Sequence, residues 1–289
     1  MSSDSEPQID AALLARLEHL DLSLRRLAHG APSGDHAAAR RGSGLLFREH
    51  RAYSVGDDPR RLDWNVYLRL GELLVKEHEA EESPRLLLVL DCSASMAMEP
   101  QPKFTVAREL ALCMGAIALM RRVLVTCAEI PATLEPTNFS GRSALPALLR
   151  RTQSLRAGAG KQRAAALADS RRAGMALCIT DLFDDATDGT VRMLAARRCE
   201  VHVLHLRDAA DLSPPLGEQV RLRDAESAEE LRVCLDASTR RAWRTTLEEH
   251  FAARTQALTA LGAVVSAFEV SEGAEGILMQ LARRGTLLH

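Results

Sequence analysis

Two short apolar runs in the sequence each lead into an aspartate. Residues 85–91 read Arg-Leu-Leu-Leu-Val-Leu-Asp and are followed by Cys-Ser-Ala-Ser, while Ile179-Thr180 precedes Asp181. Carboxylate and hydroxyl oxygens suit a hard divalent cation such as Mg²⁺. Asp91, Ser93, Ser95 and Asp181 are therefore candidate metal ligands. In the alternative interpretation, the two serines cap a following helix and Asp91 accepts backbone hydrogen bonds in a turn.

The elements that must position these side chains alternate between strand and helix patterns. Continuous apolar runs are typical of parallel strands buried on both faces, and their alternation with helical spacings predicts a doubly wound, mostly parallel α/β sheet flanked by helices. Ligands of such sheets bind beyond the carboxyl ends of the strands. The predicted strands are 85–91, 123–128, 175–180, 201–206 and 263–270, the helices 104–122, 143–155, 187–198, 239–261 and 272–284, with a hairpin near 219–236.

The part of the chain before residue 85 has a different character. Leucines spaced by three and four over residues 9–29 predict an amphipathic helix, and residues 30–44 have the composition of a linker. Four of the ten aromatic residues, Phe47, Tyr53, Trp64 and Tyr67, then fall within 21 positions. We expect an N-terminal helix and linker over 1–43, a small subdomain over 44–84 and an α/β domain over 85–289.

Two motifs resemble known families. Asp91-x-Ser93-x-Ser95 with Asp181 resembles the metal-ion-dependent adhesion site of von Willebrand factor A-like domains. The stretch from Gly44 to Trp64, followed by Leu-Val-Lys-Glu at 74–77, resembles the bacterial domain-of-unknown-function family 58. The resemblance implies a von Willebrand A-like, Rossmann-like domain after the motif subdomain. Such a site usually takes a threonine from a loop between the two aspartate strands, and Ser143 is the candidate for that position.

The resemblance also implies a function. Ser93 and Ser95 would bind Mg²⁺ (or Mn²⁺ or Ca²⁺) directly, with Asp91 and Asp181 acting mostly through water, and an acidic side chain of a protein partner would complete the ion's ligands. Family members are commonly encoded beside MoxR-type AAA+ ATPases. The expected function is thus a non-enzymatic, metal-dependent protein-interaction module, an adaptor for such an ATPase in protein assembly or maturation.

The family motif itself contains charged residues around a turn and several aromatic residues. They fit either a structural network that fixes the subdomain or a direct partner-binding surface, and the sequence leaves both open. The motif residues are Arg51, Tyr53, Gly56, Asp57, Asp58, Arg60, Asp63 and Trp64.

Other function classes find less support in the sequence. No Gly-x-Ser-x-Gly elbow occurs, and residues 155–162 depart from a phosphate-binding loop at two required positions. A metal-dependent hydrolase and a scaffold with a vestigial metal site remain as alternatives. The basic run at 142–172 contains no aromatic residue for base stacking and fits a solvated face or a protein partner.

The composition of the chain limits the class of protein and the cellular compartment that we expect. The chain has 289 residues and a formal net charge of −2, which argues against a polybasic nucleic-acid-binding or membrane-surface protein. Its basic residues are 34 Arg and only 3 Lys. Six isolated cysteines, the absence of a signal-peptide pattern and the absence of a long apolar run lead us to expect a cytoplasmic protein without a membrane span.

Overall fold

The computed structural model separates into two compact units. The smaller lies within Ala28–Ser83, and the larger combines Met1–Leu27 with Pro84–His289. Each unit is described by itself. The structure describes residues 17–19, 46–54, 62–79, 85–98, 102–130, 135–158, 174–212, 217–225, 229–285 and 287–288.

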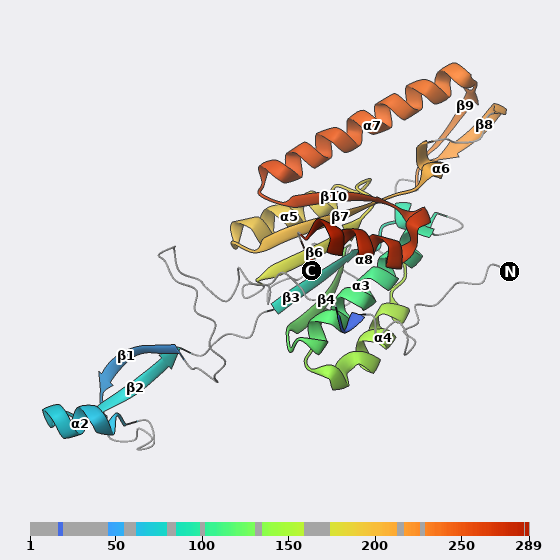
Figure 1. The fold of residues 1–289 in the computed structure, drawn as a ribbon. Helices are drawn as coiled ribbons and strands as arrows, with labels where there is room; N and C mark the ends of the chain where they lie inside the picture. Colours follow the sequence, from blue (N-terminus) through green and yellow to red (C-terminus); the bar gives the residue numbers. More distant parts are fainter. Residues whose placement is uncertain are drawn as a thin grey trace. The chain divides into compact units, whose positions relative to one another are not determined.

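A six-stranded sheet forms the centre of the larger unit (Figure 1). The strands lie in the order β10-β7-β6-β3-β4-β5, and all neighbouring pairs are parallel except β4 with β5. The predicted mostly parallel α/β sheet is thereby confirmed. The strands are β3 (Arg85–Asp91), β4 (Leu124–Ile130), β5 (Thr137–Phe139), β6 (Met175–Thr180), β7 (Glu200–Arg207) and β10 (Val264–Glu269).

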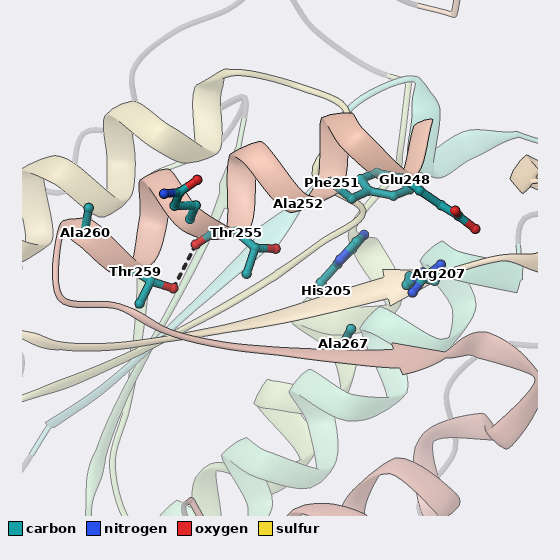
Figure 2. A pocket seen from close by; sticks show the side chains of 10 residues that line it. His205, Arg207, Glu248, Phe251, Ala252, Thr255, Thr259, Ala260 and Ala267 are labelled. Carbon is teal, nitrogen blue, oxygen red and sulfur yellow. Dashed lines mark hydrogen bonds between the residues drawn. The ribbon is translucent and has the colours of Figure 1, made fainter. Parts of the chain in front are cut away.

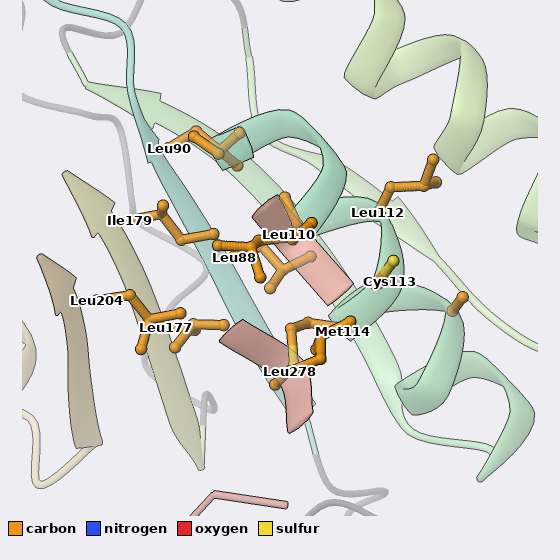
Figure 3. Packing of buried hydrophobic residues seen from close by; sticks show 14 of the residues in the cluster. Leu88, Leu90, Leu110, Leu112, Cys113, Met114, Leu177, Ile179, Leu204 and Leu278 are labelled. Atoms are coloured by element: carbon orange, nitrogen blue, oxygen red, sulfur yellow. The ribbon is translucent and has the colours of Figure 1, made fainter. Parts of the chain in front are cut away.

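Helices cover both faces of this sheet because its strands are apolar on both faces. Successive side chains of a strand point to opposite faces, so Leu86, Leu88 and Leu90 of β3 enter one core while Leu87 and Val89 enter the other. Figure 3 shows the first core, where leucines of the sheet meet α3 and α8. The helices on that face are α3 (Pro102–Met120), α4 (Leu145–Ser154) and α8 (Gly273–Arg284), and those on the other are α5 (Ala186–Ala196) and α7 (Ala237–Ala260).

Shorter elements connect these layers. The strands β8 (Gly217–Arg223) and β9 (Glu230–Leu235) pair as an antiparallel hairpin, in the region where the sequence predicts one. A four-residue helix, α6 (Ala209–Leu212), follows β7 at the carboxyl edge of the sheet. The 3₁₀ turns are η3 (Ser95–Ala97), η4 (Arg142–Ala144) and η6 (Val270–Glu272).

The smaller unit consists of a two-stranded ribbon and one short helix. Strand β1 (Leu46–Ala52) pairs antiparallel with β2 (Leu74–Glu79), and α2 (Trp64–Leu70) lies between them in sequence. Asp63 caps α2, because its Oδ1 accepts a hydrogen bond from the backbone N–H of Asn65 at 3.1 Å. Gly71, at φ 71°, ends the helix in the left-handed conformation that glycine adopts without strain.

Only residues 17–19 of the predicted N-terminal helix are described. Leu17 is buried in the core that α3 and α4 share, and a guanidinium N–H of Arg121 donates to the Glu18 carbonyl at 3.1 Å. These contacts tie this point of the N-terminus to the larger unit. The rest of the predicted helix over 9–29 and the linker at 30–43 lie outside the described residues.

Among the residues that the structure describes, no helix is long and apolar enough to cross a membrane. The six cysteines are all free thiols: Cys234 is exposed, and the other five are buried. Burial raises the pKa of Cys113 and Cys178 to about 12, so these thiols stay protonated and pack as small apolar side chains.

His205 near the end of β7 predicts an acid-sensitive core. Burial, followed by the charge of Arg207, lowers its pKa to about 3, against about 6.5 when exposed. Between these values the unfolded chain binds the extra proton, so stability falls as the pH drops from about 6.5. Between pH 7.5 and pH 5 we expect the free energy of unfolding of His205→Gln to fall by about 2 kcal/mol less than that of the wild type. Urea unfolding at the two pH values measures this difference.

His19→Gln, which changes an exposed imidazole, is the matched control and should keep the wild-type acid sensitivity. Equal losses of stability in wild type and His205→Gln would show that His205 does not carry this pH dependence.

Candidate metal centre

The two aspartates lie where the strand order of the sheet reverses. From β3 the chain continues to β4 on one side, whereas β6, β7 and β10 follow on the other. Because β3 pairs directly with β6, with Leu90 opposite Ile179, the loops after these strands are neighbours at the carboxyl edge. This is the position at which open α/β sheets bind ligands.

Hydrogen bonds join four of the five predicted metal ligands into one buried cluster. The Ser93 and Ser95 hydroxyl oxygens are 3.0 Å apart, and the Ser95 hydroxyl donates to Asp181 Oδ1 at 3.1 Å. The backbone N–H of Ser93 donates to Asp91 Oδ1 at 2.9 Å. All four residues are buried, with Asp91 2% and Asp181 1% exposed. The structure therefore brings Asp91, Ser93, Ser95 and Asp181 together.

Asp91 experiences two opposing influences. Burial and then the nearby Asp181 carboxylate raise its pKa to about 7, although hydrogen bonds from Ser93 and Thr180 oppose the rise. The Thr180 hydroxyl donates to Asp91 Oδ2 at 2.6 Å. Without a further positive charge, two ionised carboxylates at this depth are unfavourable, so the cluster favours a cation or a proton.

The loop after β6 is held in a strained shape that fixes Asp181. Leu182 has a φ of 60°, which is rare for a residue with a branched side chain. Its backbone N–H donates to the Thr180 hydroxyl at 3.0 Å, and the N–H of Phe183 donates to Asp181 Oδ1 at 3.2 Å. The buried Leu182 side chain and these bonds hold the turn in this conformation, so the Asp181 carboxylate is directed at Ser95.

Lys103 is a member of this cluster that sequence reasoning did not identify. It lies in the first turn of α3 and is only 1% exposed. Its Nζ is 2.8 Å from Asp181 Oδ2 and 3.1 Å from Asp211 Oδ2 on α6. Burial alone would lower its pKa, but these two carboxylates outweigh burial and raise it. The available signal was a lysine at the start of the helix after the serine loop, in a chain with only three lysines.

Ser143 is not brought to the cluster. It is exposed on η4, and β5 before it runs antiparallel to β4, with Phe139 opposite Val125 near the start of β4. The chain therefore reaches Ser143 at the amino edge of the sheet, opposite to Asp91. The turn after α4 does approach the serine loop, because the Gly158 N–H donates to the Cys92 carbonyl at 3.0 Å.

The motif residues of the smaller unit have different settings. Asp63 is buried and caps α2, which is a structural role, whereas Trp64 is 55% exposed. The half-buried Tyr53 is bonded through its backbone N–H to the Leu73 carbonyl at 2.9 Å, and Arg51 lies on β1 opposite Val75. Gly56, Asp57, Asp58 and Arg60 lie outside the described residues.

The chemistry of the cluster fits a hard divalent cation. Its donors are hydroxyl and carboxylate oxygens, and the two oxygen pairs named above are 3.0 and 3.1 Å apart. Adjacent oxygens of an octahedral Mg²⁺ shell are about 3 Å apart. Within the described ranges, no group of three or more His, Cys, Asp or Glu side chains is arranged to hold a metal ion, so a site here must use the serines.

A separate hollow of about 800 Å³ lies between α7 and the β7–β10 edge of the sheet (Figure 2). His205, Arg207 and Phe251 line one end, and Thr255, Thr259 and Ala260 line the other. None of the predicted metal ligands lines this hollow. The oxygen cluster therefore lies outside this hollow, although His205 of its lining makes a hydrogen bond with the Asp181 backbone.

Comparison with solved structures finds several distant likenesses, of which two are described. A conserved hypothetical protein, BatB from Bacteroides thetaiotaomicron, is 11% identical with a TM-score of 0.36, covering 70% of this chain and 98% of that one. An aerotolerance-related membrane protein from Bacteroides fragilis is 12% identical with a TM-score of 0.37, covering 70% and 100%.

Sequence comparison is more specific. The uncharacterized proteins Mb1516 from Mycobacterium bovis and Rv1480 from Mycobacterium tuberculosis are each 30% identical over 230 residues, which is 75% of this chain and 72% of theirs. The model of the family described as "Protein of unknown function DUF58" matches residues 49–253. Because this match covers more than half of the chain, the chain belongs to the DUF58 family.

Proposed function

We propose that the larger unit is a von Willebrand A-like, Rossmann-like domain with a metal-ion-dependent adhesion site, and that it acts as a non-enzymatic protein-interaction module. The observation that carries this proposal is the convergence of Asp91, Ser93, Ser95 and Asp181 at the strand-order reversal. In this proposal the ion is Mg²⁺, with Mn²⁺ or Ca²⁺ as substitutes, and the protein works in the cytoplasm.

In this proposal the ion supplies an open coordination position for an acidic side chain of a protein partner. Ser93 and Ser95 supply neutral oxygens, so little negative charge offsets the ion and its affinity for an anionic ligand stays high. Asp91 holds the serine loop through the Ser93 N–H. Thr180 in turn fixes Asp91, so the positions of the serines do not depend on the partner.

The groups beside the cluster support binding rather than hydrolysis. Cys92 is the nearest thiol in sequence, and burial followed by the charge of Glu129 raises its pKa well above the usual range. A protonated, buried thiol is a poor nucleophile. Lys103 is held as an ammonium by two carboxylates and is therefore not free to accept a proton as a general base.

A second surface supports a role in protein binding. In the smaller unit, α2 and the residues after it expose large apolar side chains: Trp64, Tyr67, Leu68, Leu70 and Leu73 are all 41–80% exposed. The Trp64 and Tyr67 rings pack edge to face with centroids 6.1 Å apart. Exposed aromatic clusters are typical of interfaces. We assign this surface to a MoxR-type AAA+ ATPase, with the chain as its adaptor in protein assembly or maturation.

The metal site predicts a selective loss of ion binding. Titration calorimetry with Mn²⁺ should show affinity reduced more than about tenfold in Ser95→Ala and Asp91→Ala, since each loses an oxygen or its support. Ser143→Ala is the matched control, because this serine is at the opposite edge of the sheet, and it should bind as the wild type does. Loss in Ser143→Ala with retention in Ser95→Ala would refute the site.

The aromatic surface predicts a separable loss of partner binding. The double variant Trp64→Ala/Tyr67→Ala should bind a purified MoxR-type ATPase more than about tenfold more weakly, because aromatic anchors dominate interface energies. Arg69→Ala changes an exposed polar residue of the same helix and should have little effect. Surface plasmon resonance measures both, and Mn²⁺ binding should be unchanged. If the wild type, the double variant and Arg69→Ala bind the ATPase equally well, α2 is not part of the interface.

A further inference from the structure

Lys103 places a positive charge at the candidate metal centre. Its Nζ contacts Asp181 Oδ2, while the other carboxylate oxygen of Asp181 accepts from Ser95. We propose that the Lys103 ammonium is the resident cation of this site, which it occupies in place of a divalent ion and from which the ion must displace it. This inference rests on the proposed metal site and deepens it by naming the residue that sets ion affinity.

The type of residue supports this role. Arginine supplies 34 of the 37 basic side chains, yet the basic residue in the cluster is one of three lysines. An ammonium is a compact point charge, whereas a guanidinium is a broad planar fork. The lysine ammonium therefore resembles a metal ion more closely than a guanidinium would, both in its size and in its preference for carboxylate oxygens.

The burial of the pair supports it as well. The Lys103 side chain is 2% exposed and that of Asp181 is 0% exposed. A buried charge without a partner is strongly destabilising, so Asp181 requires a cation beside it whenever its carboxylate is ionised. Lys103 meets this requirement in the metal-free protein. Its Nζ also lies 5.0 Å from the centre of the Phe183 ring, so both the Asp181 carboxylate and this ring hold the ammonium in position.

Asp211 gives Lys103 an alternative partner. The Lys103 Nζ already lies 3.1 Å from Asp211 Oδ2, so the ammonium can give up Asp181 without entering the core unpaired. Asp211 is anchored independently of Lys103, because its backbone carbonyl accepts from Trp243 Nε1 of α7 at 2.8 Å. An ion that binds Asp181 would therefore shift Lys103 towards a carboxylate that is already in place.

The test compares Mn²⁺ affinity in the full chain before and after the charge is removed. Lys103→Met keeps the length of the side chain without its charge and should bind Mn²⁺ at least about tenfold more tightly than the wild type. Lys103→Arg keeps the charge and should show no such gain. Titration calorimetry measures affinity, and circular dichroism confirms that each variant is folded.

A second variant tests the alternative partner and does not depend on the stability of Lys103→Met. Asp211→Asn should weaken Mn²⁺ binding relative to the wild type, although Asp211 is not a proposed ligand, because Lys103 then has no second carboxylate to move to. Unchanged or tighter binding in Asp211→Asn would overturn the exchange of Lys103 between carboxylates.

The outcomes separate this inference from the metal site itself. If wild type and Lys103→Met bind Mn²⁺ with equal, measurable affinity, Lys103 does not compete and the inference fails while the metal site stands. If neither binds Mn²⁺, both fail, and the cluster is a vestigial site in a scaffold. Tighter binding in Lys103→Met alone supports both.

Discussion

Asp91 and Asp181 are two carboxylates buried at one edge of the sheet. The side chains and backbone groups around them compensate the negative charge of these carboxylates. Burying an unpaired ion costs several kcal/mol even after the surroundings relax. The structure meets this cost with hydroxyl and backbone donors on Asp91, with the upward shift of its pKa, and with the Lys103 ammonium on Asp181.

The sheet topology explains why these charges meet. Leu86, Leu88 and Leu90 face one core and Leu87 and Val89 face the other, so β3 can only be a central strand. Since β3 has β4 on one side and β6 on the other, the chain leaves β3 towards α3 on one face of the sheet and leaves β6 towards α5 on the other, so the two aspartates meet where these loops part. Apolar patterning thus determines where the polar chemistry is located.

The sequence was informative where one strong pattern controls the structure. The runs ending at Asp91 and before Asp181 each indicate a strand and the loop after it, so four candidate ligands could be placed together from sequence. Ser143 could not, because the direction of the chain depends on the three-residue strand β5, which is too short to produce a period-two signal. Lys103 was missed because its role depends on long-range contacts to Asp181 and Asp211. The exposure of α2 likewise depends on packing.

The pairing of Asp181 with Lys103 reduces the stability that the protein would gain from binding an ion. In a site whose carboxylates are exposed before the ion arrives, the ion simply adds charge and stability. Here Asp181 is already paired, so an ion would replace one cation with another, and its net stabilisation is the difference between two favourable states. Lys103 also contacts Asp211 of α6, and the Asp211 carbonyl is hydrogen-bonded to α7. The exchange of cations would therefore affect α6 and α7 as well as the metal site. A partner that supplies the last ligand to the ion would then favour the arrangement in which Lys103 has left Asp181.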